Sequence, residues 1–275
     1  MSLRVALAQL EPVPASIESN LDKIYKVVRE YQADLYVFPE LFLTGYTSRD
    51  LLYRISQELT SNVIDRLRIV AREHRIGIVV GLSEKSSYGF LYNSLIAIDD
   101  RGEIYAYRKR HLPTFSVFDE ARWFRSYRGY VKPWSFRGVK IGFGICYDIF
   151  FPEIFKSQVL QGAKILIAIS ASPDSSVPLF HTLVRARALE NTAFFIWVNM
   201  VGFFDGLGFG GSSVVVDPLG NVVEQLKPFE EDVRIVNIDL SLVDRARIDR
   251  PIIRDSSIED AYLLLESYKY LESQA

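Results

Sequence analysis

The chain has 275 residues, of which 49% are hydrophobic and 24% charged, so it is long enough to bury a sizeable core. Its 32 basic and 34 acidic residues give a net charge of −2 without a basic block, which argues against nucleic acid or an anionic membrane as a partner. A single cysteine excludes an internal disulfide and a cysteine-based zinc cluster, and the three scattered histidines disfavour another metal site. No apolar run is long enough to span a bilayer, and the N-terminus is typical of a strand rather than a signal peptide. We therefore expect a cytoplasmic protein with neither metal nor cofactor.

The first half of the chain alternates between strand and helix patterns. Residues 3–10 (LRVALAQL) predict a strand, and residues 16–32 place apolar side chains at helical spacing with Ser16 as a plausible cap. The buried strand DLYVFPE (34–40) stops at Pro39. The elements expected after it are a helix over 58–75, the strand IGIVVGL (76–82), and the paired strands LYNSLIAID (91–99) and GEIYAYRKR (102–110).

The second half repeats this plan. The expected elements are the strand VKIGFGIC (139–146), a helix over 152–163, a strand over 164–170, a helix over 178–192, a strand over 193–200, a hairpin formed by 212–217 and 221–226, and a closing strand over 233–240. Continuous β-branched runs predict strands covered on both faces. The pattern predicts an α/β fold with two sheets packed together and helices outside, and the lack of a Ser- or Gly-rich linker favours one domain.

The C-terminal tail differs in character from the rest. After the polar stretch DRARIDRPIIRD, residues 256–275 are rich in leucine and tyrosine and predict a helix. This helix either packs on a partner subunit or docks on its own domain, and the pattern leaves both open.

Cys146 stands where chemistry is often found. It ends the apolar run VKIGFGIC and precedes YDIFFPE, so its thiol lies on a strand-to-helix turn, where nucleophiles are often presented. The alternative is a small buried hydrophobic residue. A nucleophilic thiol needs a base and a donor for the developing oxyanion. His111 and His181 are the first candidates for the base, but no third orienting group stands out beside either.

Glu40 and Lys109 are better candidates than the histidines. Glu40 is flanked by VFP and LFL, so we expect it to be half buried with a pKa raised towards neutrality, as a general base requires. The alternative is an exposed carboxylate at a strand end. The period of two places Lys109 on the same face as Tyr105 and Tyr107, where a lysine lowers the pKa of a nearby thiol and stabilises an anionic intermediate. Otherwise Lys109 belongs to a solvated basic cluster.

The segments FPELFLTGY, YRKRHLP and GFGICYDIFFPE together resemble the three signatures of the nitrilase superfamily of carbon–nitrogen hydrolases. The resemblance runs from LRVALAQL to about residue 239. It implies a four-layer α-β-β-α sandwich of the nitrilase type and a catalytic triad at Glu40, Lys109 and Cys146. In LPTFSVFDEARWF it places a second family glutamate at Glu120, which is implied to position the substrate and to hold Lys109 by an ion pair. The alternative for Glu120 is a loop carboxylate paired with Arg122.

Parts of the chain resemble one branch of this family in particular. LPTFSVFDEARWF, VNMVGFFDGLGFGGSSVV and RPIIRD are most similar to the glutaminase domains of glutamine-dependent NAD synthetases, but the chain has no phosphate-binding loop for ATP, so we expect a stand-alone domain. Family members often associate through their outer helices and crossed C-terminal tails. The resemblance therefore implies a hydrolase domain over 1–240, a tail over 241–275 packed on a partner subunit, and a homodimer or higher homo-oligomer.

The implied reaction is hydrolysis of a small-molecule amide to ammonia and a carboxylic acid through a cysteine thioester, with the backbone N–H of Tyr147 as a second oxyanion donor. A strict nitrilase, a glutaminase-type ammonia donor and a non-catalytic binding protein are the alternatives. Many members carry arginine where this chain has Ile149 and Phe150, which cannot bind a carboxylate. This favours an aliphatic or aromatic amide over free glutamine. Possible substitutes for the missing charge are Arg122, Arg185 and Arg187. Aromatic residues around the site indicate a partly apolar acyl pocket, although most of them are expected to be core residues: Phe115, Phe118, Phe150, Phe203 and Phe204.

Overall fold

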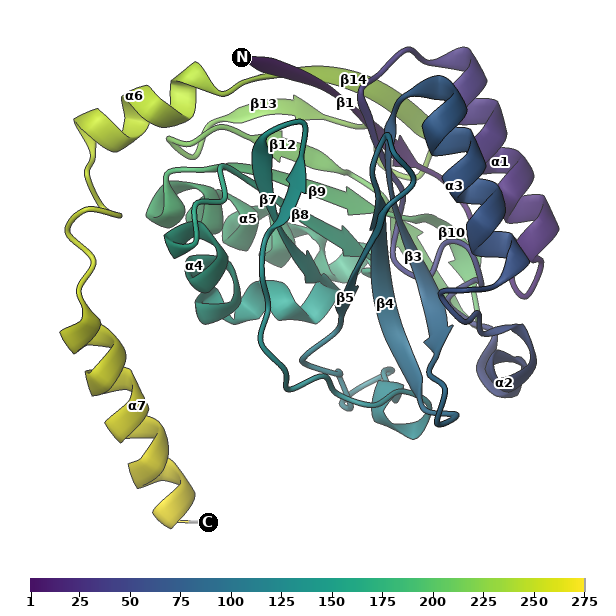
Figure 1. Ribbon diagram of the computed structural model, residues 1–275. Helices are drawn as coiled ribbons and strands as arrows, with labels where there is room; N and C mark the ends of the chain where they lie inside the picture. The colour runs from purple at the N-terminus through teal and green to yellow at the C-terminus, as the bar shows by residue number, and fades with distance from the viewer. Residues whose placement is uncertain (275) are drawn as a thin grey trace.

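Two six-stranded sheets pack against each other in the computed structural model, which describes residues 1–274 (Figure 1). Helices cover the outer face of each sheet, so the layers follow the order α-β-β-α. The predicted α/β class and four-layer sandwich are therefore confirmed.

The first sheet is built from the N-terminal half and one returning strand. Its order is β14-β1-β2-β3-β4-β5, with β1, β2 and β3 parallel and the other pairs antiparallel. Its strands are β1 (Ser2–Gln9), β2 (Leu35–Val37), β3 (Gly77–Lys85), β4 (Leu91–Ile98), β5 (Ile104–Arg108) and β14 (Asp232–Asp239). Helices α1 (Ile17–Glu30) and α3 (Asn62–His74) cover its outer face, with the short α2 (Leu52–Ile55) between them in the chain. Ser16 occupies the N-cap position of α1, although its hydroxyl makes no capping bond.

The second sheet has the order β13-β12-β9-β8-β7-β6 and carries the thiol. Its strands are β6 (Trp134–Phe136), β7 (Val139–Ile145), β8 (Ile165–Ser170), β9 (Phe194–Asn199), β12 (Val214–Val216) and β13 (Val222–Gln225). Helix α4 (Pro152–Leu160) packs on β7, and α5 (Val177–Asn191) packs on β9 and β12. Gln158 attaches α4 to β7, because its side chain both accepts from the N–H of Phe143 and donates to its carbonyl, each at 2.8 Å.

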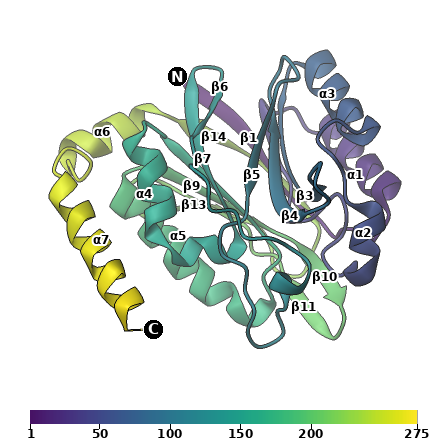
Figure 2. The same cartoon turned by 60° about the horizontal axis from the view of Figure 1, so that its bottom comes forward.

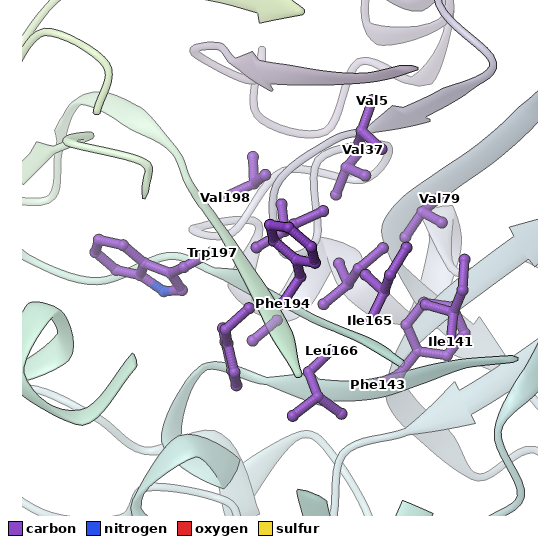
Figure 3. Close-up of a cluster of buried hydrophobic side chains, with 14 of the residues drawn as sticks. Val5, Val37, Val79, Ile141, Phe143, Ile165, Leu166, Phe194, Trp197 and Val198 are labelled. Atoms are coloured by element: carbon purple, nitrogen blue, oxygen red, sulfur yellow. The ribbon is translucent and has the colours of Figure 1, made fainter. Parts of the chain in front are cut away.

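The main core lies between the sheets. Every residue of β8 and β9 is buried, as the continuous apolar runs predicted. Figure 3 shows the contact between inner faces, where valines of the first sheet meet larger side chains of the second: Val5, Val37 and Val79 opposite Ile141, Phe143 and Ile165. This rigid layer fixes the strand ends from which the candidate site residues project.

Several elements were not predicted, among them the short helix α2 described above. The hairpin of β10 (Val201–Phe204) and β11 (Leu207–Gly210) turns at Asp205-Gly206, a strong turn signal that lies beyond the predicted strand 193–200. Strand β6 is only three residues long. Helix α6 (Ser241–Asp249) begins just before the polar stretch, and it buries Val243 and Ala246 against the body of the protein. Its exposed face mixes polar side chains with Leu242 and Ile248, which is why the helical pattern is weak.

The predicted tail 241–275 also contains α7 (Ile258–Ser273). None of the residues of α7 is buried, and the helix lies at the outer edge of the molecule, away from both sheets (Figure 2). Among the described residues, its one polar contact with the rest of the protein is the hydrogen bond from Tyr268 Oη to Glu153 Oε1, at 3.4 Å. Its exposed apolar side chains include Tyr262, Leu263, Leu264, Leu265, Tyr268, Tyr270 and Leu271. None of the helices within residues 1–274 has both the length and the apolar character that a bilayer crossing requires.

Candidate active site

Cys146 is the first residue of a 3₁₀ turn (Cys146–Phe150) that joins β7 to α4. Its φ of 47° lies in the left-handed region, which residues other than glycine seldom occupy. Backbone strain of this kind persists where the surrounding structure enforces it, often at functional sites. The N–H of Tyr147 lies at the start of this 3₁₀ turn, where amide groups have no partner within the turn. The thiol and this N–H are therefore presented by the same turn.

Asp148 fixes this turn to the strand that leads to Lys109. The buried Asp148 accepts from Tyr107 Oη at 2.8 Å, from Ile145 N–H at 3.2 Å and from His111 N–H at 3.0 Å. Because Tyr107 belongs to β5, two residues before Lys109, this carboxylate couples the position of Cys146 to that of Lys109. Sequence reasoning gave Asp148 no role.

The histidines do not form a pair with the thiol. The His111 ring contacts Asp148 Oδ1 at 3.1 Å, and His181 Nε2 contacts the Ser212 carbonyl at 2.8 Å. The side chain within hydrogen-bond distance of Cys146 Sγ is instead the Ser172 hydroxyl, at 3.6 Å.

Glu40 follows β2 and is completely buried, beyond the half burial expected from its apolar neighbours. Its Oε1 accepts from Lys109 Nζ and Asn93 Nδ2, each at 2.7 Å, and its Oε2 accepts from the N–H of Ala171 at 2.7 Å. The turn that carries Glu40 packs directly on Gly81 of β3. A Cβ at Gly81 would lie 2.3 Å from the backbone nitrogen of Leu41 and 2.7 Å from the Cα of Glu40, so only glycine fits there.

Lys109 lies between two carboxylates. Its Nζ is 2.7 Å from Glu40 Oε1 and 2.7 Å from Glu120 Oε1, and the side chain has no exposed surface. As the period of two predicted, Tyr107 and Lys109 face inward while Arg108 pairs with Glu84 on the other face. The ion pair that the resemblance implied for Glu120 is present.

Glu120 has no role as a partner of Arg122. The Glu120 carboxylate also lies 3.4 Å from Tyr46 Oη and 3.4 Å from Asn93 Nδ2. The Arg122 guanidinium lies over the ring of Trp123, 4.8 Å from its centroid. Glu120 is therefore part of the buried polar cluster rather than a surface loop.

Burial controls the electrostatics of this cluster. It raises the pKa of the Cys146 thiol to about 12, with a further rise from Glu40 and an opposing effect of Lys109, so the thiol is protonated at neutral pH. Burial alone lowers the pKa of Lys109, but Glu120 and Glu40 more than offset this and raise it, so the ammonium is kept. Burial also raises the pKa of Glu120 to about 7 against the attraction of Lys109. A neutral thiol, a fixed cation and buried carboxylates are the parts that base-assisted nucleophilic attack requires.

The family model for carbon–nitrogen hydrolases matches residues 4–248. The chain belongs to the carbon–nitrogen hydrolase family. The prediction of the superfamily is confirmed, and with it the prediction of an enzyme of this type.

Several relatives of this carbon–nitrogen hydrolase are known by name. A glutamine-dependent NAD(+) synthetase of Aquifex aeolicus is 36% identical over 90% of this chain, but the chain spans only 44% of that protein. An (R)-stereoselective amidase of Pseudomonas is 31% identical over 92% of this chain and 91% of its own length. Among solved structures, a glutamate-to-glutamine mutant of the amidase from Nesterenkonia carries the acetamide moiety of fluoroacetamide covalently on its active-site cysteine. It is 28% identical, with a TM-score of 0.79 over 94% of this chain and 95% of its own.

Several polar residues around the site were missed by sequence reasoning. Ser172, beside the thiol, is held by Asn199, which accepts from its N–H at 2.8 Å and donates to its carbonyl at 3.1 Å. Both residues stand at the carboxyl ends of buried parallel strands, where ligand-binding sites are often found. This position was the available sign of a functional role. Asn93 interrupts the apolar pattern of β4, and this was the available signal for it.

A cleft of about 440 Å³ opens beside Glu120 and is lined by Tyr46 and Arg122, among others. Of the three arginines considered for carboxylate binding, only Arg122 lines it. Arg185 and Arg187 instead donate to the carbonyls of Gly220 and Ile149.

The interpretation of most of the nearby phenylalanines as core residues was wrong. Phe115, Phe150 and Phe203 are 50%, 38% and 71% exposed. Phe115 and Phe150 flank Tyr147, with ring centroids 5.2 and 5.3 Å away, so they form an aromatic surface next to Cys146. Within residues 1–274, no group of three or more His, Cys, Asp or Glu side chains is arranged to hold a metal ion.

Proposed function

We propose that this protein hydrolyses the carbon–nitrogen bond of a small-molecule amide, with Glu40, Lys109 and Cys146 as its catalytic triad. The observation that carries the proposal is the buried cluster in which Lys109 contacts both Glu40 and Glu120 at 2.7 Å, beside a protonated thiol on a strained turn. The acetamide moiety bound covalently to the cysteine of the related amidase supports a nucleophilic role for Cys146.

In the first half of the reaction, Glu40 takes the thiol proton as Cys146 Sγ attacks the amide carbonyl carbon. The Lys109 ammonium and the N–H of Tyr147 stabilise the oxyanion of the tetrahedral intermediate. Collapse of this intermediate breaks the carbon–nitrogen bond, and Glu40 returns its proton to the leaving group. Ammonia departs and a thioester remains on Cys146.

In the second half, Glu40 takes a proton from water as the water oxygen attacks the thioester carbonyl. The carbon–sulfur bond breaks, the thiolate regains its proton from Glu40, and a carboxylic acid is released. One base acts in both halves, which suits a carboxylate held in place by donors to each of its oxygens.

The favoured substrate is an uncharged aliphatic or aromatic amide. Ile149 is buried and Phe150 packs between Tyr147 and Phe180, so the segment after the cysteine offers an aromatic surface and no cation. Free glutamine is the second candidate, because the NAD synthetase relative shares 36% identity and Arg122 lines the neighbouring cleft. A nitrile is the third, since the same triad serves both reactions.

Ammonia release from matched substrates tests the proposal. We expect turnover of amides such as isobutyramide or benzamide to exceed that of glutamine and of the corresponding nitriles, and the Cys146→Ala variant to be inactive on all of them. Preference for glutamine would refute the argument from the aromatic surface. Turnover by Cys146→Ala would refute the mechanism.

We also propose that α7 of the tail packs on a second copy of this chain, because its leucine and tyrosine side chains are exposed on the monomer. A Leu263→Glu, Leu271→Glu double variant should lower the mass measured by light scattering, whereas Tyr88→Glu, on a loop residue 87% exposed, should not. A wild-type monomer would contradict this proposal.

A further inference from the structure

The side-chain amide of Asn93 lies between the two buried carboxylates. Asn93 belongs to β4 and is 1% exposed. Its Nδ2 donates to Glu40 Oε1 at 2.7 Å and to Glu120 Oε2 at 3.4 Å. Since both neighbours accept when ionised, the nitrogen and not the oxygen of the amide must face them.

The opposite end of this amide has no partner. Asn93 Oδ1 is buried and makes no hydrogen bond to any described residue. An unsatisfied buried acceptor destabilises the folded state, and an apolar residue of similar size would avoid that cost. The sequence nevertheless has asparagine here, so the donation to the carboxylates must offset the loss.

We propose that Asn93 is a positioning residue that separates the roles of the two glutamates. Its neutral donor bridges Glu40 and Glu120, so that both can share Lys109 while Glu40 stays aimed as the base. This inference rests on the proposed function, in which Glu40 is the base, and adds to it a residue outside the triad and the second glutamate.

The charges around Asn93 explain why such a donor is needed. The titratable groups that face this amide or its two partners are Glu40, Lys109, Glu120, Cys146 and Tyr46. One lysine cannot fully neutralise two buried carboxylates, so without a further donor one of them would take up a proton more easily. In line with this, burial raises the pKa of Glu120 while the bonds from Lys109 and Asn93 lower it.

Two Asn93 substitutions separate hydrogen bonding from packing. Asn93→Ala removes the donor and some volume, whereas Asn93→Asp keeps the shape and replaces the donor with an acceptor. Asn191 provides a matched control, because it is equally buried, its Oδ1 is also unpartnered within residues 1–274, and its Nδ2 donates to the Arg187 carbonyl away from the triad.

The measurements are kcat and KM on an amide that the wild type hydrolyses, across the pH range, together with the melting temperature. We expect kcat to fall about 100-fold in Asn93→Ala and further in Asn93→Asp, with little change in KM, as for a misplaced catalytic group. The acid limb of the pH profile should move up by about one pH unit, because loss of a donor raises the pKa of a carboxylate that must be ionised. Asn191→Ala should lower the melting temperature and keep the wild-type profile.

The outcomes separate this inference from the proposed function. If the wild type releases ammonia and forms an adduct on Cys146, but Asn93→Ala keeps its kcat and pH profile, the inference alone is overturned. If Asn191→Ala changes the profile as much as Asn93→Ala, a general packing effect explains both and the inference is likewise overturned. A wild type that neither turns over nor is acylated on Cys146 overturns the proposed function and the inference with it. Should Asn93→Ala not fold, Asn93→Ser keeps one donor and should show an intermediate shift, and an unshifted limb would count against the inference.

Discussion

Replacing Lys109 with methionine tests how the charges of the site are balanced. The substitution keeps an unbranched side chain but removes the ammonium that lies 2.7 Å from both Glu40 and Glu120. The two buried carboxylates then have no cation next to them, and an uncompensated buried charge is among the most destabilising changes known.

The structure sets the size of the effect. Breaking a buried pair costs about 3–5 kcal/mol. Here the lower end applies, because Glu40 keeps its bonds from Asn93 and Ala171, and Glu120 keeps those from Asn93 and Tyr46. A loss of about 3 kcal/mol corresponds to a fall in melting temperature of about 6–12 °C for a chain of this length.

The deficit should depend on pH with a definite sign. The pKa of Glu120 is already raised from 4.5 to about 7 with Lys109 present, and it rises further once that cation is lost. A carboxyl whose folded pKa exceeds its unfolded value stabilises the fold at low pH and loses this contribution as pH rises through the folded pKa. The variant should therefore be closer to wild type at about pH 6 than at about pH 9.

Thermal unfolding followed by circular dichroism at both pH values measures this. Lys23→Met is the control, since Lys23 pairs with Glu231 at 2.7 Å on the surface and its loss should cost less than about 1 kcal/mol. A difference in melting temperature of about 2 °C corresponds to a loss of at most about 1 kcal/mol in the free energy of unfolding. A Lys109→Met protein that melts this close to wild type at the higher pH would refute the charge balance described here. A deficit that is equal at both pH values would refute it as well.

Three further predictions follow from the geometry. Gly81→Ala should lower kcat about 100-fold by displacing Glu40. Gly208→Ala is the control and should keep the wild-type kcat, because its Cβ would meet no atom closer than 3.8 Å. Steady-state kinetics measure both, and equal rates would contradict the tight packing of the Glu40 turn on Gly81. Alkylation of Cys146 by iodoacetamide should be slow near neutral pH in Glu40→Gln, because burial still keeps the thiol protonated, and it should accelerate at alkaline pH. Fast labelling at neutral pH would show that no base is needed. Phe150→Arg should shift substrate preference towards amides that bear a carboxylate, because arginine binds that group. The ratio of the kcat/KM values for succinamate and butyramide measures this shift. An unchanged ratio would show that residue 150 does not face the acyl group.

Much of the architecture could be predicted because the core strands have strong local signals. Residues 165–170 and 194–199 are continuous apolar runs and form strands buried on both faces, as expected. Helix α6 was missed because only Val243 and Ala246 need to be buried for it to pack, too few to stand out among charged residues. The exposed position of Phe203 was also missed, because a phenylalanine in an apolar run gives no sign that a hairpin carries it outward.

The candidate site was predictable at the ends of strands and not within them. Glu40, Lys109 and Cys146 all stand where an apolar run stops, so a polar side chain is conspicuous there. Asp148 and Asn93 act through contacts with residues 41 and 53 positions away, Tyr107 and Glu40, and no local pattern encodes such distances. The glycine at position 81 is explained only by the backbone of Leu41 packed against it.

Mass spectrometry of the intact protein after incubation with isobutyramide tests the central claim most directly. One covalent acyl adduct is expected, located on Cys146 by peptide mapping, absent in Cys146→Ala and formed more slowly in Glu40→Gln, where the base that takes the thiol proton is lost. Absence of any adduct while ammonia is released, or an adduct on another residue, would contradict Cys146 as the nucleophile.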